Sequence, residues 1–127
     1  MFHPSLKQFS EAKELCESYS GDHGRSHLVS IHDNDTNNFL VQNVVAKFGP
    51  VNTWIGLGDV YENGTFSWVD GSKFDYNNFH RTQPDLISTE NCVHLWDLWV
   101  GNSPFTWNNI YCNVYYPFIC QKTITPK

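Results

Sequence analysis

The sequence of 127 residues has no excess of basic side chains and no long hydrophobic run. Eight Lys and Arg stand against thirteen Asp and Glu, which gives a formal net charge of −5. Nucleic acids and anionic membranes require a basic surface, so neither is an expected partner. No apolar run approaches the roughly 20 residues that a membrane-spanning helix needs. We therefore expect no nucleic-acid binding and no membrane insertion by this segment.

Patterns typical of zinc sites and of nucleophilic enzymes are also missing. The six histidines form no i, i+4 pair within a predicted helix, and no Cys-x-x-Cys pair occurs. We interpret His32, His80 and His94 as packed, capping or solvated side chains rather than catalysts. Asp85 and Glu90 are candidates for a glycosidase pair, but no apolar pocket is evident to raise the pKa of either one. The sequence therefore predicts a protein that is not an enzyme.

What the sequence does contain is a high aromatic fraction of 16% and an even number of cysteines. The cysteines are Cys16, Cys92, Cys112 and Cys120. An even count in a small, turn-rich chain favours two disulfides and an oxidising compartment. The count alone leaves three connectivities open.

Several features fit a protein that has been exported from the cell. The chain starts without a signal-peptide pattern, and we interpret it as a trimmed mature domain. Asn34 and Asn63 each begin a possible N-glycosylation sequon, although such short motifs also arise by chance. We expect a single domain over residues 1–127, secreted or on the extracellular face of the cell surface.

Local patterns predict a helical first half and a strand-rich second half. A helix is predicted over residues 10–19 with Ser10 as N-cap, followed by an exposed loop over 21–26. A second helix is predicted over 34–48, with a buried stripe that includes Phe39, Leu40, Val44, Val45 and Phe48. A short strand or extended piece is predicted at 28–31, and short strands are predicted at 54–57, 66–69, 93–96, 105–107 and 116–120. We interpret Trp54, Trp68 and Trp107 as core residues.

Two polar stretches carry oxygen-bearing side chains of the kind that bind a hard cation. Gln83, Asp85 and Glu90 lie in one stretch, where Pro84 stiffens the backbone between the first two. Asn108 and Asn109 lie in a second predicted loop at 107–112. Carboxylate and amide oxygens are the ligands that Ca²⁺ prefers in proteins. The sequence therefore predicts that these two stretches lie side by side around a cation.

The motifs of the chain resemble, in their order, the C-type lectin-like domain family. They are Ala12 to Cys16, LVSI at 28–31, WIGL at 54–57, WVDGS at 68–72, QPD at 83–85, ENC at 90–92, WNN at 107–109 and FIC at 118–120. The resemblance runs over about residues 9–121. It implies an α+β fold with two helices flanking two small antiparallel sheets, a long structured loop over about 59–90, and the disulfides Cys16–Cys120 and Cys92–Cys112.

The resemblance also implies a site and a ligand class. By motif, the calcium ligands are Gln83, Asp85, Glu90, Asn108 and Asn109, and the first four also bind the sugar hydroxyls. The Gln-Pro-Asp order is the arrangement that this family associates with galactose and N-acetylgalactosamine. Trp99 is the candidate aromatic for stacking on the sugar.

Departures from the family pattern set limits on this site. Asn109 stands where the family usually has Asp, so we expect modest calcium affinity. Leu86 and Asn91 replace acids of the family's auxiliary calcium site, so we expect one calcium ion and not two. The family's usual opening strand, with its upstream Trp and Cys-Tyr, is missing, and we interpret Phe2 and His3 as its remnant.

The resulting prediction is a calcium-dependent lectin domain that binds terminal galactose or N-acetylgalactosamine glycans and is compatible with oligomerisation. The alternative is a C-type lectin-like module that binds a protein, mineral or ice ligand and has a weakened or absent calcium site.

Overall fold

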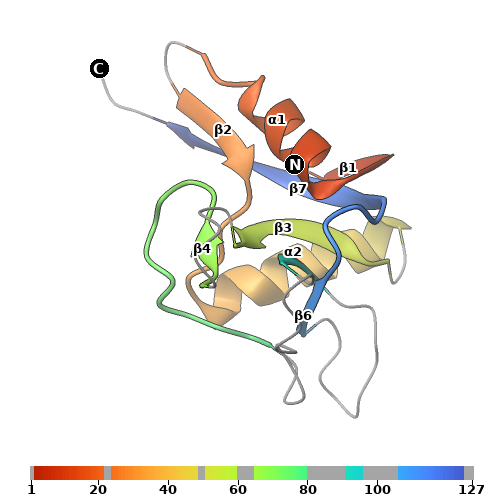
Figure 1. The fold of residues 1–127 in the computed structure, drawn as a ribbon. Coiled ribbons are helices and arrows are strands. Elements are labelled where there is room, and N and C mark those ends of the chain that lie inside the picture. The colour runs from red at the N-terminus through yellow and green to blue at the C-terminus, as the bar shows by residue number, and fades with distance from the viewer. Residues whose placement is uncertain are drawn as a thin grey trace.

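The computed structural model describes residues 2–21, 24–48, 51–59, 65–79, 91–95 and 106–124. Its elements run in the following order: β1 (Phe2–Lys7), α1 (Phe9–Glu17), β2 (Gly24–Leu28), α2 (Asn34–Phe48), β3 (Thr53–Gly58), β4 (Ser67–Trp68), β5 (Cys92–Leu95), β6 (Trp107–Ile110) and β7 (Tyr116–Ile124) (Figure 1). Within these residues, neither helix is long and apolar enough to cross a membrane. The α+β class predicted from the sequence is confirmed.

The strands are joined through β7. They follow the order β1-β7-β3-β5-β6, with β2 also paired to β7 and β4 paired to β3. The expected antiparallel pairing holds except between β3 and β7, which run parallel where Trp54 meets Phe118. One network forms instead of two separate sheets because β7 is nine residues long, enough to pair with β1 and β3 near its start and with β2 beyond.

The first helix begins one residue before its predicted N-cap. Gln8 is the observed N-cap, with an extended ψ of 162°, and Phe9 is the first helical residue, so the assignment to Ser10 was wrong. The backbone N–H of Gln8 donates to Oε1 of Glu11 at 2.9 Å, which is the return half of a capping box. Phe9, Ala12 and Cys16 form the buried face of the helix.

The second helix has the predicted bounds, and its buried face agrees with the predicted one only in part. Phe39 is 64% exposed, whereas Asn37 is 2% exposed and accepts a hydrogen bond from Nε1 of Trp107 at 2.9 Å. The buried stripe therefore runs through Asn37, Leu40 and Val44, at helical spacing. Leu40 and Val44 were predicted on this face, whereas the inclusion of Phe39 was wrong. A hydrophobic pattern could not include Asn37, because this core position carries a polar side chain.

Two strands lie at other residues than predicted. β2 shares only Leu28 with the piece predicted at 28–31 and occupies part of the predicted loop at 21–26, because β7 continues to Ile124 and pairs with β2 back to Gly24. The four residues of β6 extend across the predicted loop at 107–112. The opening residues form a complete strand, β1, which pairs antiparallel with β7 from Phe2 to Lys7.

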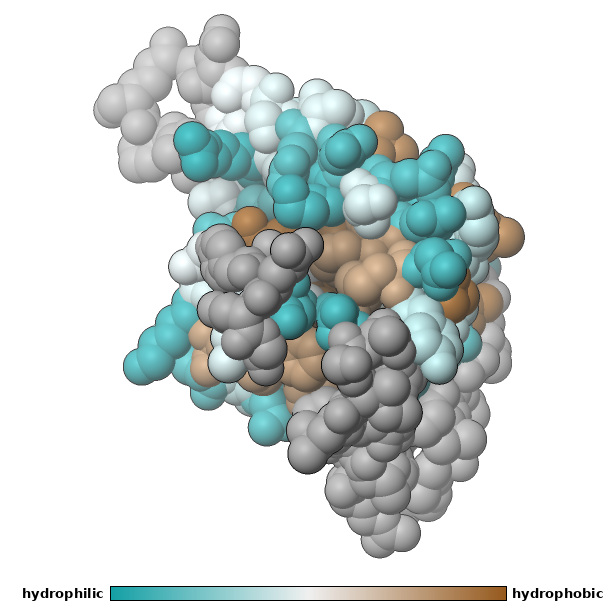
Figure 2. Space-filling view, viewed as in Figure 1, coloured by the Kyte–Doolittle hydropathy of each residue, from teal (hydrophilic) through white to brown (hydrophobic). Residues whose placement is uncertain are grey.

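Three tryptophans fill the centre of the molecule, as predicted. Trp54, Trp68 and Trp107 are fully buried, and Trp68 and Trp107 meet edge to face with ring centroids 5.6 Å apart. α2 lies along one side of β3, whereas α1 lies with β1, β2 and β7 on the other (Figure 1). On the face shown in Figure 2, hydrophobic surface is confined to patches bordered by hydrophilic side chains.

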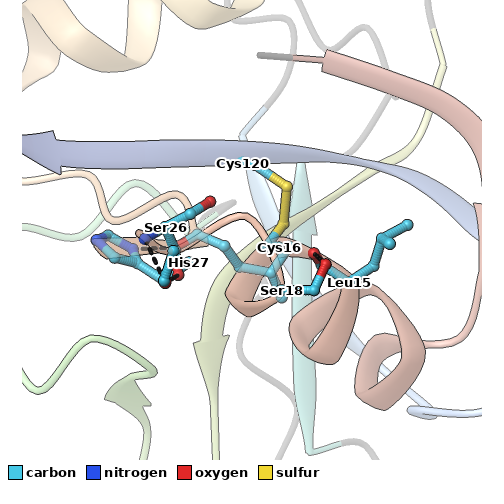
Figure 3. The surroundings of a disulfide bond; sticks show 8 residues. Leu15, Cys16, Ser18, Ser26, His27 and Cys120 are labelled. Atoms are coloured by element: carbon cyan, nitrogen blue, oxygen red, sulfur yellow. Dashed lines mark hydrogen bonds between the residues drawn. A yellow bond between two sulfur atoms is a disulfide. The ribbon is translucent and has the colours of Figure 1, made fainter. Parts of the chain in front are cut away.

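Both predicted disulfides are present. Cys16–Cys120 ties α1 to β7 across 104 residues of sequence (Figure 3), and Cys92–Cys112 ties the start of β5 to the turn after β6 across 20 residues. On the chain-entropy model, loops of these lengths correspond to about 5 and about 3 kcal/mol of stabilisation. The second disulfide fixes the two strands that carry part of the predicted site.

A carboxylate at the end of β4 holds the following turn against the segment before α2. Oδ2 of Asp70 accepts a hydrogen bond from the Ser30 hydroxyl at 2.9 Å, and Oδ1 accepts one from the Ser72 backbone N–H at 2.9 Å. Gly71, with φ of 79°, provides the left-handed backbone that the turn requires. Partial burial raises the pKa of Asp70, but the hydrogen bonds from Ser72 and Ser30 lower that pKa by more.

We expect Asp70 to make the free energy of unfolding fall at acidic pH. Because its pKa is lowered on folding, its contribution is complete above the unfolded pKa of about 3.9 and is lost as the pH falls through the lower folded value. Urea unfolding of the wild type and of Asp70→Asn should differ at pH 7 and converge below about pH 4. The exposed Glu14→Gln serves as control. A gap between wild type and Asp70→Asn that is unchanged at low pH would contradict the assignment.

A second prediction concerns Gly56, whose backbone touches the chain before α2. A Cβ at this position would lie 2.7 Å from the Leu28 carbonyl oxygen and 2.9 Å from that of Val29. Moving backbone atoms away from the new methyl group costs free energy, so Gly56→Ala should lower the free energy of unfolding by about 1–3 kcal/mol. Gly21→Ala is the matched control, because nothing lies within 4 Å of its Cβ position. Equal chemical-denaturation midpoints for the two variants would contradict the prediction.

Candidate functional site

The described part of the predicted site lies on β6. Asn108 and Asn109 are consecutive residues of this strand, which pairs antiparallel with β5. The other predicted ligands, Gln83, Asp85 and Glu90, lie outside the described residues, as do Trp99 and the sequon at Asn63. The described part of the site therefore consists of the strand that carries Asn108 and Asn109 and of the contacts that neighbouring segments make with this strand.

The chain segment 80–90 is attached to β6 at both of its flanks. Before it, the Asn78 carbonyl oxygen accepts a hydrogen bond from the Trp107 backbone N–H at 2.8 Å, and Phe79 forms a parallel bridge with Trp107. After it, Cys92 pairs with Ile110. Asn108 and Asn109 lie between these two attachment points on the same strand.

The flank after this segment is held by three further contacts. The Asn91 carbonyl oxygen accepts a hydrogen bond from the Asp59 backbone N–H at 2.8 Å. A Cβ on Gly58 would lie 3.0 Å from the same carbonyl oxygen, so any larger residue there would displace this carbonyl slightly. Together with the disulfide at Cys92, these contacts fix the backbone immediately after Glu90.

Asn108 is nearly buried and is hydrogen-bonded to a histidine. Its exposed fraction is 8%, and its Nδ2 lies 3.0 Å from Nε2 of His94, the residue opposite it on β5. Strand neighbours that are directly opposite share one face of the sheet. The contact therefore holds the amide from the side that faces α1 and Trp54.

His94 is packed, in line with the interpretation from the sequence. It is 1% exposed, its ring meets Tyr116 at a centroid distance of 4.9 Å, and its Nδ1 lies 2.9 Å from the Leu95 carbonyl oxygen. Burial lowers the pKa of His94 to about 4, although the hydrogen bond to Leu95 acts in the opposite direction. The imidazole is therefore neutral at pH 7. Its contact with Asn108 was not anticipated, because cross-strand register is not visible in a short polar strand.

Asn109 is fully buried on the opposite face of β6. It pairs with Val93, and alternate residues of a strand point to opposite sides of the sheet. Asn109 also has an interaction within the protein. The two neighbouring amide side chains therefore do not point in the same direction, although both backbone carbonyls belong to the same short strand.

The described residues contain no cluster of three or more His, Cys, Asp or Glu side chains able to hold a metal. They contribute amide oxygens, which suit calcium, while the predicted carboxylates belong to the segment outside them. A cavity of about 570 Å³ is lined by Arg25, His27 and Asp70 among others, and neither Asn108 nor Asn109 is among its described lining residues. Asn34 is exposed at the start of α2 and accepts a hydrogen bond from the Tyr76 hydroxyl at 3.2 Å.

Sequence comparison relates the chain to lectins. It is 32% identical over 121 residues to the alpha-N-acetylgalactosamine-specific lectin of Patiria pectinifera, and the alignment covers 94% of this chain and 70% of that protein. It is 31% identical over 128 residues to asialoglycoprotein receptor 1 of Mus musculus, which covers 94% of this chain and 39% of the receptor.

Structural comparison gives the same family. The C-type lectin CEL-I from Cucumaria echinata has a TM-score of 0.87 at 27% identity, over 98% of this chain and 89% of that one. A Ca²⁺-dependent type II antifreeze protein in its Ca²⁺-free form has a TM-score of 0.80 at 28% identity, over 97% of this chain and 90% of that one. The family model for the lectin C-type domain matches residues 5–122. This chain therefore belongs to the C-type lectin domain family.

Proposed function

We propose that the domain binds one calcium ion and, through it, a carbohydrate with exposed vicinal hydroxyls. The proposed calcium ligands are Gln83, Asp85, Glu90 and Asn108, together with Asn109, whose side chain would have to turn from the opposite face of β6 to reach the same ion. The observation that carries the proposal is the attachment of the 80–90 segment to β6 on both sides of the two asparagines. Three of the five ligands lie within that segment, and the other two lie between its attachment points.

The donor set fits calcium and a modest affinity. Asp85 and Glu90 would supply two formal negative charges, and amide oxygens would supply further ligands. Calcium accepts six to eight oxygens, so positions remain for two hydroxyl groups of a sugar. Asn109 contributes no charge where a carboxylate would strengthen binding. Calcium would serve as the bridge, while the protein side chains orient the hydroxyl groups by hydrogen bonds.

Galactose and N-acetylgalactosamine are the proposed sugars. Gln83-Pro84-Asp85 presents an amide before a carboxylate, the order associated with these sugars in the family, and Trp99 is the proposed stacking residue. The similarity to a lectin named for α-N-acetylgalactosamine supports this preference. The domain is proposed to bind its sugar without catalysis.

We also propose that the domain acts outside the cytosol. Two disulfides, with no free cysteine among the described residues, fit an oxidising compartment. The domain is therefore proposed to be secreted or to lie on the extracellular face of the cell surface. Asn34 and Asn63 are proposed glycosylation sites. Asn34 is exposed, as an attached glycan requires.

A second candidate function is binding of ice, a mineral or a protein through the same region. The similarity to the type II antifreeze protein favours it, together with Leu86 and Ile87, which follow the Gln-Pro-Asp motif where galactose binders of the family commonly carry an aromatic. Under this alternative, sugar binding is absent and calcium binding is weak or absent.

The two candidates are separated by titrating the domain with galactose and with mannose, each with calcium and with excess chelator. We expect galactose to bind in calcium, mannose to bind more weakly, and both to be released by the chelator. Glu90→Gln should abolish binding without unfolding the domain, as circular dichroism would verify. Binding of neither sugar at any calcium concentration would favour the second candidate.

A further prediction concerns Asn109→Asp. A third carboxylate should tighten calcium binding by roughly tenfold, because ligand charge tunes calcium affinity. The side chain is fully buried, and burial of a charge is costly, so the new carboxylate should lower the free energy of unfolding by about 1–3 kcal/mol in calcium-free buffer. Calorimetric titration and urea unfolding measure the two effects. The exposed Asn113→Asp is the control, and unchanged calcium affinity in Asn109→Asp would exclude its side chain as a ligand.

A further inference from the structure

We infer that His94 is a positioning residue that fixes the amide of Asn108, so that its Nδ2 points inward and its Oδ1 is left to bind the cation. The inference rests on the proposed function for its consequence, but the orientation itself follows from the contacts of the described residues. His94 lies on β5 and is not among the residues proposed above to bind calcium or sugar.

The first step is the tautomer of His94. Nδ1 lies 2.9 Å from the Leu95 carbonyl oxygen, and a carbonyl oxygen can only accept a hydrogen bond. Nδ1 must therefore carry a hydrogen. In a neutral imidazole the other nitrogen, Nε2, is then an acceptor with one lone pair.

The second step is the neutrality of the ring. His94 is 1% exposed and is enclosed by the rings of Trp54 and Tyr116. No carboxylate within the described residues forms an ion pair with it. A buried cation without a charged partner is strongly disfavoured, so Nε2 carries no hydrogen.

The third step is the amide of Asn108. Only an N–H group can donate to Nε2, so the nitrogen of the Asn108 side chain, at 3.0 Å, is the atom that faces His94. This removes the twofold ambiguity of an amide side chain. Oδ1 then lies on the other branch of the amide, away from His94, with both of its lone pairs free of that contact.

As a consequence, the atoms of the Asn108 amide bind three different partners. One of the two N–H bonds of Asn108 is used by His94, Oδ1 serves as the calcium ligand, and the remaining N–H is available to a sugar hydroxyl. Without the acceptor on His94, rotation of the amide by a half turn would direct its N–H groups toward the cation. Residues that orient a metal ligand in this way typically contribute about 10–100-fold to metal affinity.

Three variants test the inference. His94→Phe retains a buried ring but removes the acceptor, and it should weaken calcium binding about tenfold or more. His94→Gln supplies an acceptor oxygen near the position of Nε2 and should restore most of the affinity. His27→Phe is the matched control, because His27 is also buried, at 7% exposure, and its Nδ1 contacts the Leu28 carbonyl oxygen at 2.8 Å, but it lies on β2.

Calcium affinity is measured by calorimetric titration and stability by urea unfolding. Both Phe variants should lose stability, since each leaves a backbone carbonyl without its imidazole partner, but only His94→Phe should lose calcium affinity. Equal losses of calcium affinity in His94→Phe and His27→Phe, or a failure of His94→Gln to restore binding, would overturn the inference.

Nitrogen-15 NMR of the calcium-free protein separates this inference from the proposed function. The spectrum should show a protonated Nδ1 and an unprotonated Nε2 in His94, coupled through a hydrogen bond to the Asn108 side-chain amide. A protonated Nε2, or an Asn108 amide unaffected by His94→Phe, would refute the inference whatever calcium does. If this spectrum is observed but the wild type binds no calcium, the proposed function fails while the orientation of Asn108 stands.

Discussion

The backbone of β7 provides the hydrogen bonds that join three other strands of the sheet, β1, β2 and β3. It pairs with β1 and β3 near its start and with β2 from Cys120 onward, while Cys120 also carries the disulfide to α1. Elements from the two ends of the chain and from its middle thus meet on one strand. Contacts between residues far apart in sequence are costly in chain entropy, and the disulfide across 104 residues offsets part of that cost.

The candidate site is built on the strand at the far end of this network. β6 contributes Asn108 and Asn109 from a rigid, buried backbone, and the neighbouring segments are fixed at Asn78 and Asn91 on either side. Binding geometry is more precise when supporting contacts lock the side chains before the ligand arrives. His94 performs this role for Asn108 within the sheet, whereas Asn109 is held within the opposite side of the core.

Periodicity and capping signals predicted the bounds of α2 and the burial of Trp54, Trp68 and Trp107, because these depend on local sequence. The disulfide pairing followed from resemblance and not from the cysteine count. The burial of Asn37 on α2 was missed because its amide is satisfied through Trp107, a partner 70 residues away. The position of β2 depends on the length of β7, and the orientation of Asn108 depends on register with β5. The length of β7 and the register between β5 and β6 both depend on residues far away in the sequence, so local patterns could not predict them.

One edge of the sheet is formed by β1, and its sequence affects how copies of the domain meet. Pro4 removes a backbone donor from this strand, and the register with β7 is irregular between His3 and Lys7. Edge strands with proline and an irregular backbone are poor templates for another strand. Neighbouring molecules at high local concentration would therefore find few backbone groups to pair with along β1, so this edge of the sheet does not favour strand-to-strand association.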